Sequence, residues 1–81
     1  MQVRVRLFAV LRETAGRGEL ELQLDERATA GDAWGALVER HPELGPRQAS
    51  LATAVNRRYA RFDTPLREGD ELVFIPPVSG G

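Results

Sequence analysis

Two short stretches near the start of the chain alternate strictly between apolar and polar residues. The first runs from Val3 to Leu7, and the second runs from Glu19 to Leu24. A repeat of two residues is typical of a β-strand with one buried face. Between them, Gly16-Arg17-Gly18 predicts a hairpin-like connection, with room for one helical turn before the glycines. We therefore expect the two strands to pair in the antiparallel sense.

Phe8 continues the first strand and falls on its outer face, together with Arg4 and Arg6. A large aromatic side chain is less expected on that face than a polar one. Two interpretations follow. Either the next loop covers Phe8, or Phe8 belongs to a contact surface for a partner.

The middle of the chain has helical spacing. Thr29, with Asp32 three residues later, has the pattern of a helix N-cap with an acidic residue in the first turn. Apolar residues then recur on one face until His41-Pro42, where the proline disfavours further helix. The pattern predicts a helix over residues 30–40, with Trp34 in the core. His41 has no second ligand type nearby, so we interpret it as structural.

The second half of the chain predicts three more strands. Residues 51–56 and 59–62 are expected to pair through a tight turn around Asn56, and residues 43–50 are expected to form a surface connection. The last strand, 71–75, is apolar on both faces. If it lies beside the first strand, its outer residues, Val73 and Ile75, join Phe8 in an apolar strip on the open face of the sheet. Such a strip suggests a docking surface.

Composition removes several classes of function. The length and the balance of 42% hydrophobic to 28% charged residues fit one globular domain. The net charge is −1 and the arginines are scattered, which argues against nucleic-acid binding. No apolar run approaches the roughly 20 residues of a membrane span, and no signal segment opens the chain, so we expect a cytoplasmic protein. The absence of cysteine excludes disulfides and thiolate zinc sites.

The candidate chemistry lies in the last residues. Pro76-Pro77 predicts a stiff, extended arm beyond the last strand, and Gly80-Gly81 offers a slim end without side chains. We therefore divide the chain into a folded domain, 1–75, and a flexible tail, 76–81. A terminal carboxylate is a poor electrophile at neutral pH, but conversion to an acyl-adenylate with ATP would make the Gly81 carbonyl open to attack by sulfur. The rest of the chain supplies no base, nucleophile or metal set, so catalysis should lie in its partners.

The chain resembles the ubiquitin-like β-grasp sulfur carriers in two respects. The first is the order of its elements. The second is the segment 66–71, which leads through an apolar strand to Pro76-Pro77 and Gly80-Gly81. The resemblance covers the whole chain and is strongest to the molybdopterin synthase small subunits of the MoaD type. It implies an α+β fold, with a mixed sheet of four to five strands and one main helix packed across it.

The resemblance also implies roles for particular residues. Gly81 takes the thiocarboxylate position, with Gly80 as its slim neighbour. Family members contact their activating enzyme and large subunit through an apolar surface and the arm that follows it. Here those positions are held by Phe8, Tyr59, Ile75, Pro76, Pro77 and Val78. The implied partners are a ubiquitin-activator-like adenylating enzyme that uses ATP, a sulfurtransferase, and the large subunit of molybdopterin synthase. The carrier itself is expected to bind no cofactor.

Three other interpretations stay open. Carriers of this fold also supply sulfur for thiamine and for tRNA thiolation. A ubiquitin-like protein modifier would join Gly81 to lysines of other proteins, and the lack of lysine in this chain does not exclude that role, because the chain would be the donor. In the third interpretation the domain is an interaction module whose terminal glycines are a frayed end.

Overall fold

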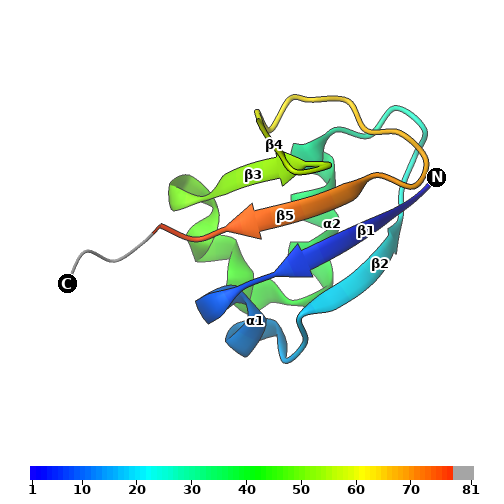
Figure 1. Cartoon of the computed structure of the whole chain (residues 1–81). Helices are drawn as coiled ribbons and strands as arrows, with labels where there is room; N and C mark the ends of the chain where they lie inside the picture. The colour runs from blue at the N-terminus through cyan, green and yellow to red at the C-terminus, as the bar shows by residue number, and fades with distance from the viewer. Residues whose placement is uncertain (78–81) are drawn as a thin grey trace.

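The computed structural model describes residues 1–77, apart from the side chains of residues 47–49. Five strands form one mixed sheet in the order β2-β1-β5-β3-β4, and the longest helix, α2, lies behind the sheet in the view of Figure 1. The other face of the sheet carries no helix in that view. The arrangement confirms the predicted α+β class, with a mixed sheet and one main helix across it.

The two alternating stretches form β1 (Gln2–Leu7) and β2 (Glu19–Gln23), which pair antiparallel as predicted. The connection between them contains a full helix, α1 (Ala9–Ala15), where the sequence indicated a single turn. Gly16 ends this helix at φ 77°, a left-handed conformation that glycine adopts without steric cost. Leu11 of α1 is completely buried, so the connection contributes to the core.

Helix α2 (Ala30–Arg40) has the predicted bounds. Thr29 and Asp32 form a reciprocal capping box: the Asp32 N–H donates to Thr29 Oγ1 over 3.2 Å, and the Thr29 N–H donates to Asp32 Oδ2 over 2.9 Å. Trp34 is buried on the inner face of the helix, as predicted. Together, α2 and the inner face of the sheet enclose the core.

The connection after α2 is more ordered than the sequence indicated. Residues 43–50 were expected to form a surface connection with room for a short helical turn, and they lie in the 3₁₀ helix η1 (Pro42–Ser50), which packs against α1 and α2. Leu44 of this segment is completely buried. Its burial could not be predicted from periodicity, because apolar residues do not recur at a regular spacing in this short helix. Tertiary packing therefore decided its burial.

The remaining strands are β3 (Ala52–Val55), β4 (Arg58–Ala60) and β5 (Glu71–Ile75). Asn56 and Arg57 form the tight turn between β3 and β4, both with positive φ (51° and 72°). β4 begins and ends slightly earlier than predicted, and Phe62 beyond it stacks on Phe74 with ring centroids 6.3 Å apart. β5 lies between β1, to which it runs parallel, and β3, to which it runs antiparallel.

Candidate functional site

The open face of the sheet, which we define as the face turned away from α2, divides into two ends of different character. Strand register fixes its side chains: Arg6 lies opposite Val73, Val73 opposite Ala54, and Ala54 opposite Tyr59. Ala52 lies opposite Ile75 in the next row. Aliphatic and aromatic residues therefore occupy the part of the open face where β5 ends.

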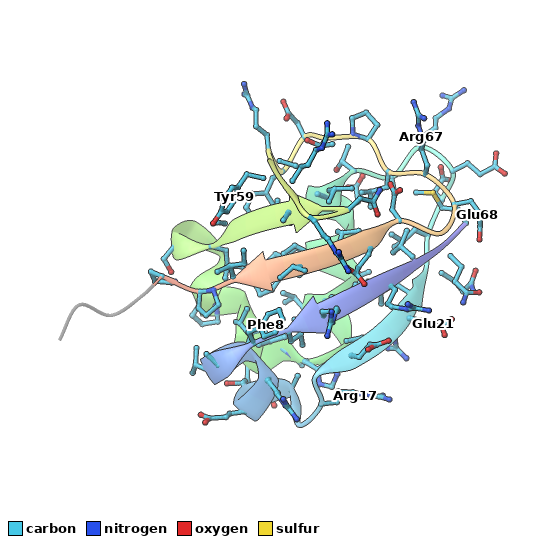
Figure 2. The ribbon with its side chains drawn as sticks, in the orientation of Figure 1. Phe8, Arg17, Glu21, Tyr59, Arg67 and Glu68 are labelled. Carbon is cyan, nitrogen blue, oxygen red and sulfur yellow. The ribbon has the colours of Figure 1, made fainter. Side chains whose placement is uncertain are left out.

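Charged residues occupy the other part of the open face. Arg4 lies between Glu71 of β5 and Glu21 of β2, and its Nε is 3.3 Å from Glu19 Oε1. Figure 2 shows Phe8 and Tyr59 toward the C-terminal end of β5, whereas Glu21 and Glu68 lie toward the opposite end of the sheet. We call the set Phe8, Tyr59, Val73 and Ile75 the apolar end of the open face.

Phe8 is placed in this end by the parallel pairing of β1 and β5. Leu7 pairs with Phe74, and Phe8 and Ile75 follow them directly at the same end of the sheet. The Phe8 backbone stays extended (φ −126°, ψ 159°), which keeps its side chain on the open face with Arg6. The side chain is 45% exposed, so the following segment does not cover it. The sequence left open whether the next loop covers Phe8 or Phe8 belongs to a contact surface. The exposure of the ring favours the contact surface.

Tyr59 is the most exposed large apolar residue of the described chain, at 81%. It lies on β4, two strands away from β5 and roughly 10 Å across the sheet at the usual strand spacing. The small residues Ala52 and Ala54 lie between Tyr59 and β5 and leave a shallow surface there. Exposed aromatic side chains around such a surface are typical of interaction sites.

The start of β5 is fixed by a hydrogen-bonded turn. The N–H of Arg67 donates to Asp70 Oδ2 over 2.8 Å, and Gly69 within this turn has φ 80°. Asn56 Nδ2 donates to Asp70 Oδ1, and the N–H of Glu71 donates to Asn56 Oδ1. The β3–β4 turn is thus joined to the first residue of β5, and this junction holds the strand that leads to the tail in register.

Phe74 anchors the other end of the same strand. Its side chain is completely buried beside Trp34 and Phe62, while Ile75, the next residue, is only half-buried on the open face. The strand ends at Ile75, and Pro76 and Pro77 follow it outside the sheet, with Pro77 exposed. The predicted reactive and contact residues Val78, Gly80 and Gly81 lie outside the described residues. The division into a domain and a flexible tail therefore stays a prediction.

The described part of the chain holds no group of three or more His, Cys, Asp or Glu side chains that could bind a metal ion. None of its helices has the length and apolar character that a membrane span requires. The sequence analysis did not predict one contact on this surface: the guanidinium carbon of Arg6 lies 5.8 Å from the centre of the Phe8 ring.

Comparison with solved structures establishes the class of fold. SAMP1 from Haloferax volcanii, a small archaeal modifier protein, superposes with a TM-score of 0.92 at 36% identity, and the match covers 100% of both chains. An archaeal ubiquitin from Caldiarchaeum subterraneum shares the fold at 20% identity (TM-score 0.67, covering 100% of this chain and 98% of that one). A complex of subunits 1 and 2 of the molybdopterin-converting factor from Helicobacter pylori also contains this fold (TM-score 0.68, 24% identity, 100% of both chains). The protein is a ubiquitin-like β-grasp protein, as predicted.

The sequence comparisons define the family within this class. The model of the ThiS family matches residues 5–81, and the chain belongs to this family of sulfur carriers, which includes the MoaD type. The molybdopterin synthase sulfur carrier subunit of Chlamydomonas reinhardtii is 36% identical over 83 aligned positions, which cover 100% of both proteins.

Proposed function

We propose that this chain is a sulfur carrier that reacts through the carboxylate of Gly81. The observation that carries the proposal is the position of the apolar end of the open face. Phe8 and Ile75 lie where β5 ends and Pro76 begins. A partner that binds this surface is therefore placed to receive residues 76–81, whose sequence offers no bulky side chain after Val78.

The chemistry requires activation from outside. Attack of the carboxylate on the α-phosphate of ATP forms an acyl-adenylate and releases pyrophosphate. A nucleophile at the oxidation level of hydrosulfide then forms a C–S bond at the acyl carbon and expels AMP, which leaves a thiocarboxylate. The described residues contain no cysteine and no candidate metal site for these steps. We assign the steps to partners: an adenylating enzyme of the ubiquitin-activator type, which uses the ATP, and a sulfurtransferase.

Molybdopterin synthesis is the proposed destination of the sulfur. The relative from Chlamydomonas reinhardtii is named as the sulfur carrier subunit of molybdopterin synthase and matches this chain from end to end. In this proposal, the large subunit of the synthase binds the apolar end of the open face and receives the tail. The chain then acts as the small, sulfur-donating subunit and not as an enzyme by itself.

A second candidate function is protein modification. It is favoured by the likeness to the solved structure of SAMP1 from Haloferax volcanii, which is named as a small archaeal modifier protein. The two functions share the adenylation step and differ in the acceptor. Sulfur is the nucleophile that attacks the activated Gly81 carbonyl in the first function, and a lysine amine of a target protein attacks it in the second.

Intact-mass analysis after incubation with the adenylating enzyme, ATP and a sulfur donor tests the proposal. A carrier gains the mass of one sulfur-for-oxygen exchange at Gly81, and omission of ATP abolishes the gain. An unchanged mass under conditions that load a known carrier would refute sulfur transfer. Addition of the loaded chain to the large synthase subunit and the pterin precursor then tests the destination, since molybdopterin forms only if the chain serves that pathway. Appearance of Gly81–lysine conjugates without a thiocarboxylate would support the modifier function instead.

A further inference from the structure

Three arginine side chains that form no ion pair among the described residues line adjoining hollows near Phe8 and α1, and Arg17 also lines a hollow with Glu19 and Glu21. Arg6 is in β1, Arg12 is in α1, and Arg17 is in the turn before β2, and all three residues are exposed. The ion pairs found among the described residues are Arg4–Glu19 and Arg61–Asp63. Like charges on one small surface repel each other, so an anion that pairs with these arginines would relieve the repulsion.

The surface between these arginines is hollowed. A depression of about 310 Å³ adjoins Phe8, and a second of about 540 Å³ lies next to it under α1. Arg12 and Gly18 line both, so the two depressions adjoin each other. We call the pair the arginine hollow. Its lining residues are Arg6, Leu7, Phe8, Ala9, Arg12, Glu13, Gly16, Arg17, Gly18 and Glu19.

Two of the guanidinium groups are held by contacts that do not neutralise them. The guanidinium of Arg6 lies near the Phe8 ring, 5.8 Å from its centre, an attraction between a cation and an aromatic face. Arg12 lies against the backbone of Gly18, where a Cβ would approach its Nε to 3.1 Å. Glycine at position 18 therefore leaves the space that Arg12 occupies. Both charges are positioned in advance and remain free to pair with an anion.

The carboxylates near the hollow do not remove this positive charge. Glu19 lines the depression next to Phe8 and lies opposite Arg6 in the strand register, but its carboxylate is 3.3 Å from Arg4 Nε. Glu13 is the other acidic residue in the lining. Three arginines therefore line the hollow with two glutamates, one of which is paired with Arg4. A guanidinium next to an exposed aromatic ring suits a carboxylate that has an apolar neighbour.

We propose that the arginine hollow binds an acidic segment of the adenylating enzyme, with a carboxylate paired to Arg6 and Arg12 and an adjacent apolar side chain against Phe8. The inference rests on the proposed function, because the occupant is a segment of the protein that docks on the apolar end of the open face. It adds the chemistry of that partner. It also assigns a recognition role to residues outside the apolar end.

The opposite end of the open face makes this contact directional. A second hollow, of about 240 Å³, lies at the start of β5 and is lined by Glu21, Glu68 and Glu71 as well as Arg4. Figure 2 shows Glu21 and Glu68 at the end of the sheet away from Phe8. A partner with an acidic segment is attracted to one end and repelled from the other, so charge favours the orientation that brings the tail to the partner.

Charge reversal tests the proposal. The double variant Arg6→Glu/Arg12→Glu is compared with Arg27→Glu/Arg67→Glu, in which two exposed arginines outside the hollow change the net charge equally. We expect at least a tenfold loss of affinity for the adenylating enzyme in the first variant at low ionic strength, mostly in the association rate, and less than a threefold loss in the control. The difference should shrink in high salt. Equal losses in the two variants would overturn the inference. Thermal unfolding of both variants shows whether the fold is intact.

A measurement without the enzyme separates this inference from the proposed function. The wild-type chain, labelled with nitrogen-15, is titrated with the peptide acetyl-Leu-Asp-Leu-Glu-Leu-amide and with its Asn/Gln counterpart. Amide shifts at Phe8, Arg12 and Gly18 with the acidic peptide alone support the hollow. Equal shifts with both peptides, or none at these residues, overturn it. The outcome of the titration does not depend on whether the chain accepts sulfur. If no adenylating enzyme binds the wild-type chain, the titration alone decides whether the hollow binds an acidic segment.

Discussion

The ring of Trp34 meets the ring of Phe74 nearly edge-on, with centroids 5.0 Å apart and planes inclined by 67°. This contact joins α2 to β5 at the point where the strand passes from the core to the open face of the sheet. Phe74 is completely buried, and Ile75 next to it lies on the open face. Because Trp34 Nε1 has no hydrogen-bond partner among the described residues, packing holds the indole in place.

Phe74→Ala should strongly destabilise the fold. The substitution leaves a cavity beside Trp34 and Phe62, and such changes cost about 3–5 kcal/mol. Urea denaturation measures the loss. Phe74→Leu keeps most of the volume and serves as the matched control, with an expected loss of less than half as much. Equal losses for the two variants would show that the aromatic contacts and the cavity do not determine the stability of this strand.

Phe8→Ala should weaken binding to the adenylating enzyme and leave the fold stable. The ring is 45% exposed, so its removal costs the core little, whereas an exposed aromatic at the centre of an interface contributes about 1–2 kcal/mol or more to binding. Calorimetric titration measures the affinity. Glu26→Ala, at an exposed position in the loop between β2 and α2, is the control and should bind as the wild type does. A large fall in melting temperature for Phe8→Ala would place the ring in the core instead.

Asn56 should be needed for the register of β5. Its side chain joins Asp70 to the N–H of Glu71, and its backbone has φ 51°. Asn56→Gly keeps the backbone conformation and removes the side-chain bonds, with an expected loss of about 1–2 kcal/mol. Asn56→Ala adds the cost of positive φ and should lose about 1 kcal/mol more. Denaturation of both variants separates the two effects. Equal stability of the glycine variant and the wild type would show that the side-chain hydrogen bonds of Asn56 do not stabilise the fold.

Thr29→Ala tests the start of α2. The change removes the hydroxyl that accepts the Asp32 N–H, and loss of such a cap costs about 1 kcal/mol. Thr29→Ser retains the acceptor and should be nearly neutral. Thermal unfolding compares the two variants. If serine and alanine destabilise equally, the methyl group of Thr29 and not its oxygen supports the helix.

Removal of Gly81 should abolish sulfur loading without affecting the fold. Leu7 pairs with Phe74, and β5 ends at Ile75, so the sheet is complete before the tail begins. We expect an unchanged melting temperature and no mass gain with the adenylating enzyme, ATP and sulfur donor. Gly35→Ala is the control. It changes a glycine with open space around its Cβ position and should load normally. Loading of the truncated chain would show that the reacting group lies elsewhere.

The sequence determined the local elements because their signals are local. Strict alternation predicts β1 and β2, the Thr29–Asp32 spacing predicts the start of α2, and Asn56 predicts the turn after β3. Each of these signals depends on contacts within a few residues, which the order of side chains fixes. The family resemblance supplied the β-grasp class and the candidate residues Phe8, Tyr59 and Ile75.

Only the tertiary structure decided which of these residues share a surface. Leu44 carries no periodic signal, and its burial depends on α1 and α2 packing around η1. Phe8 and Ile75 stand 67 positions apart in the chain (75 − 8 = 67), and they lie at the same end of the sheet because β1 and β5 run parallel. The arginine hollow likewise needs β1, α1 and the turn before β2 in one place. Local propensity sets the elements, but long-range pairing sets the surfaces, since a side chain's neighbours across the sheet are chosen by the whole fold.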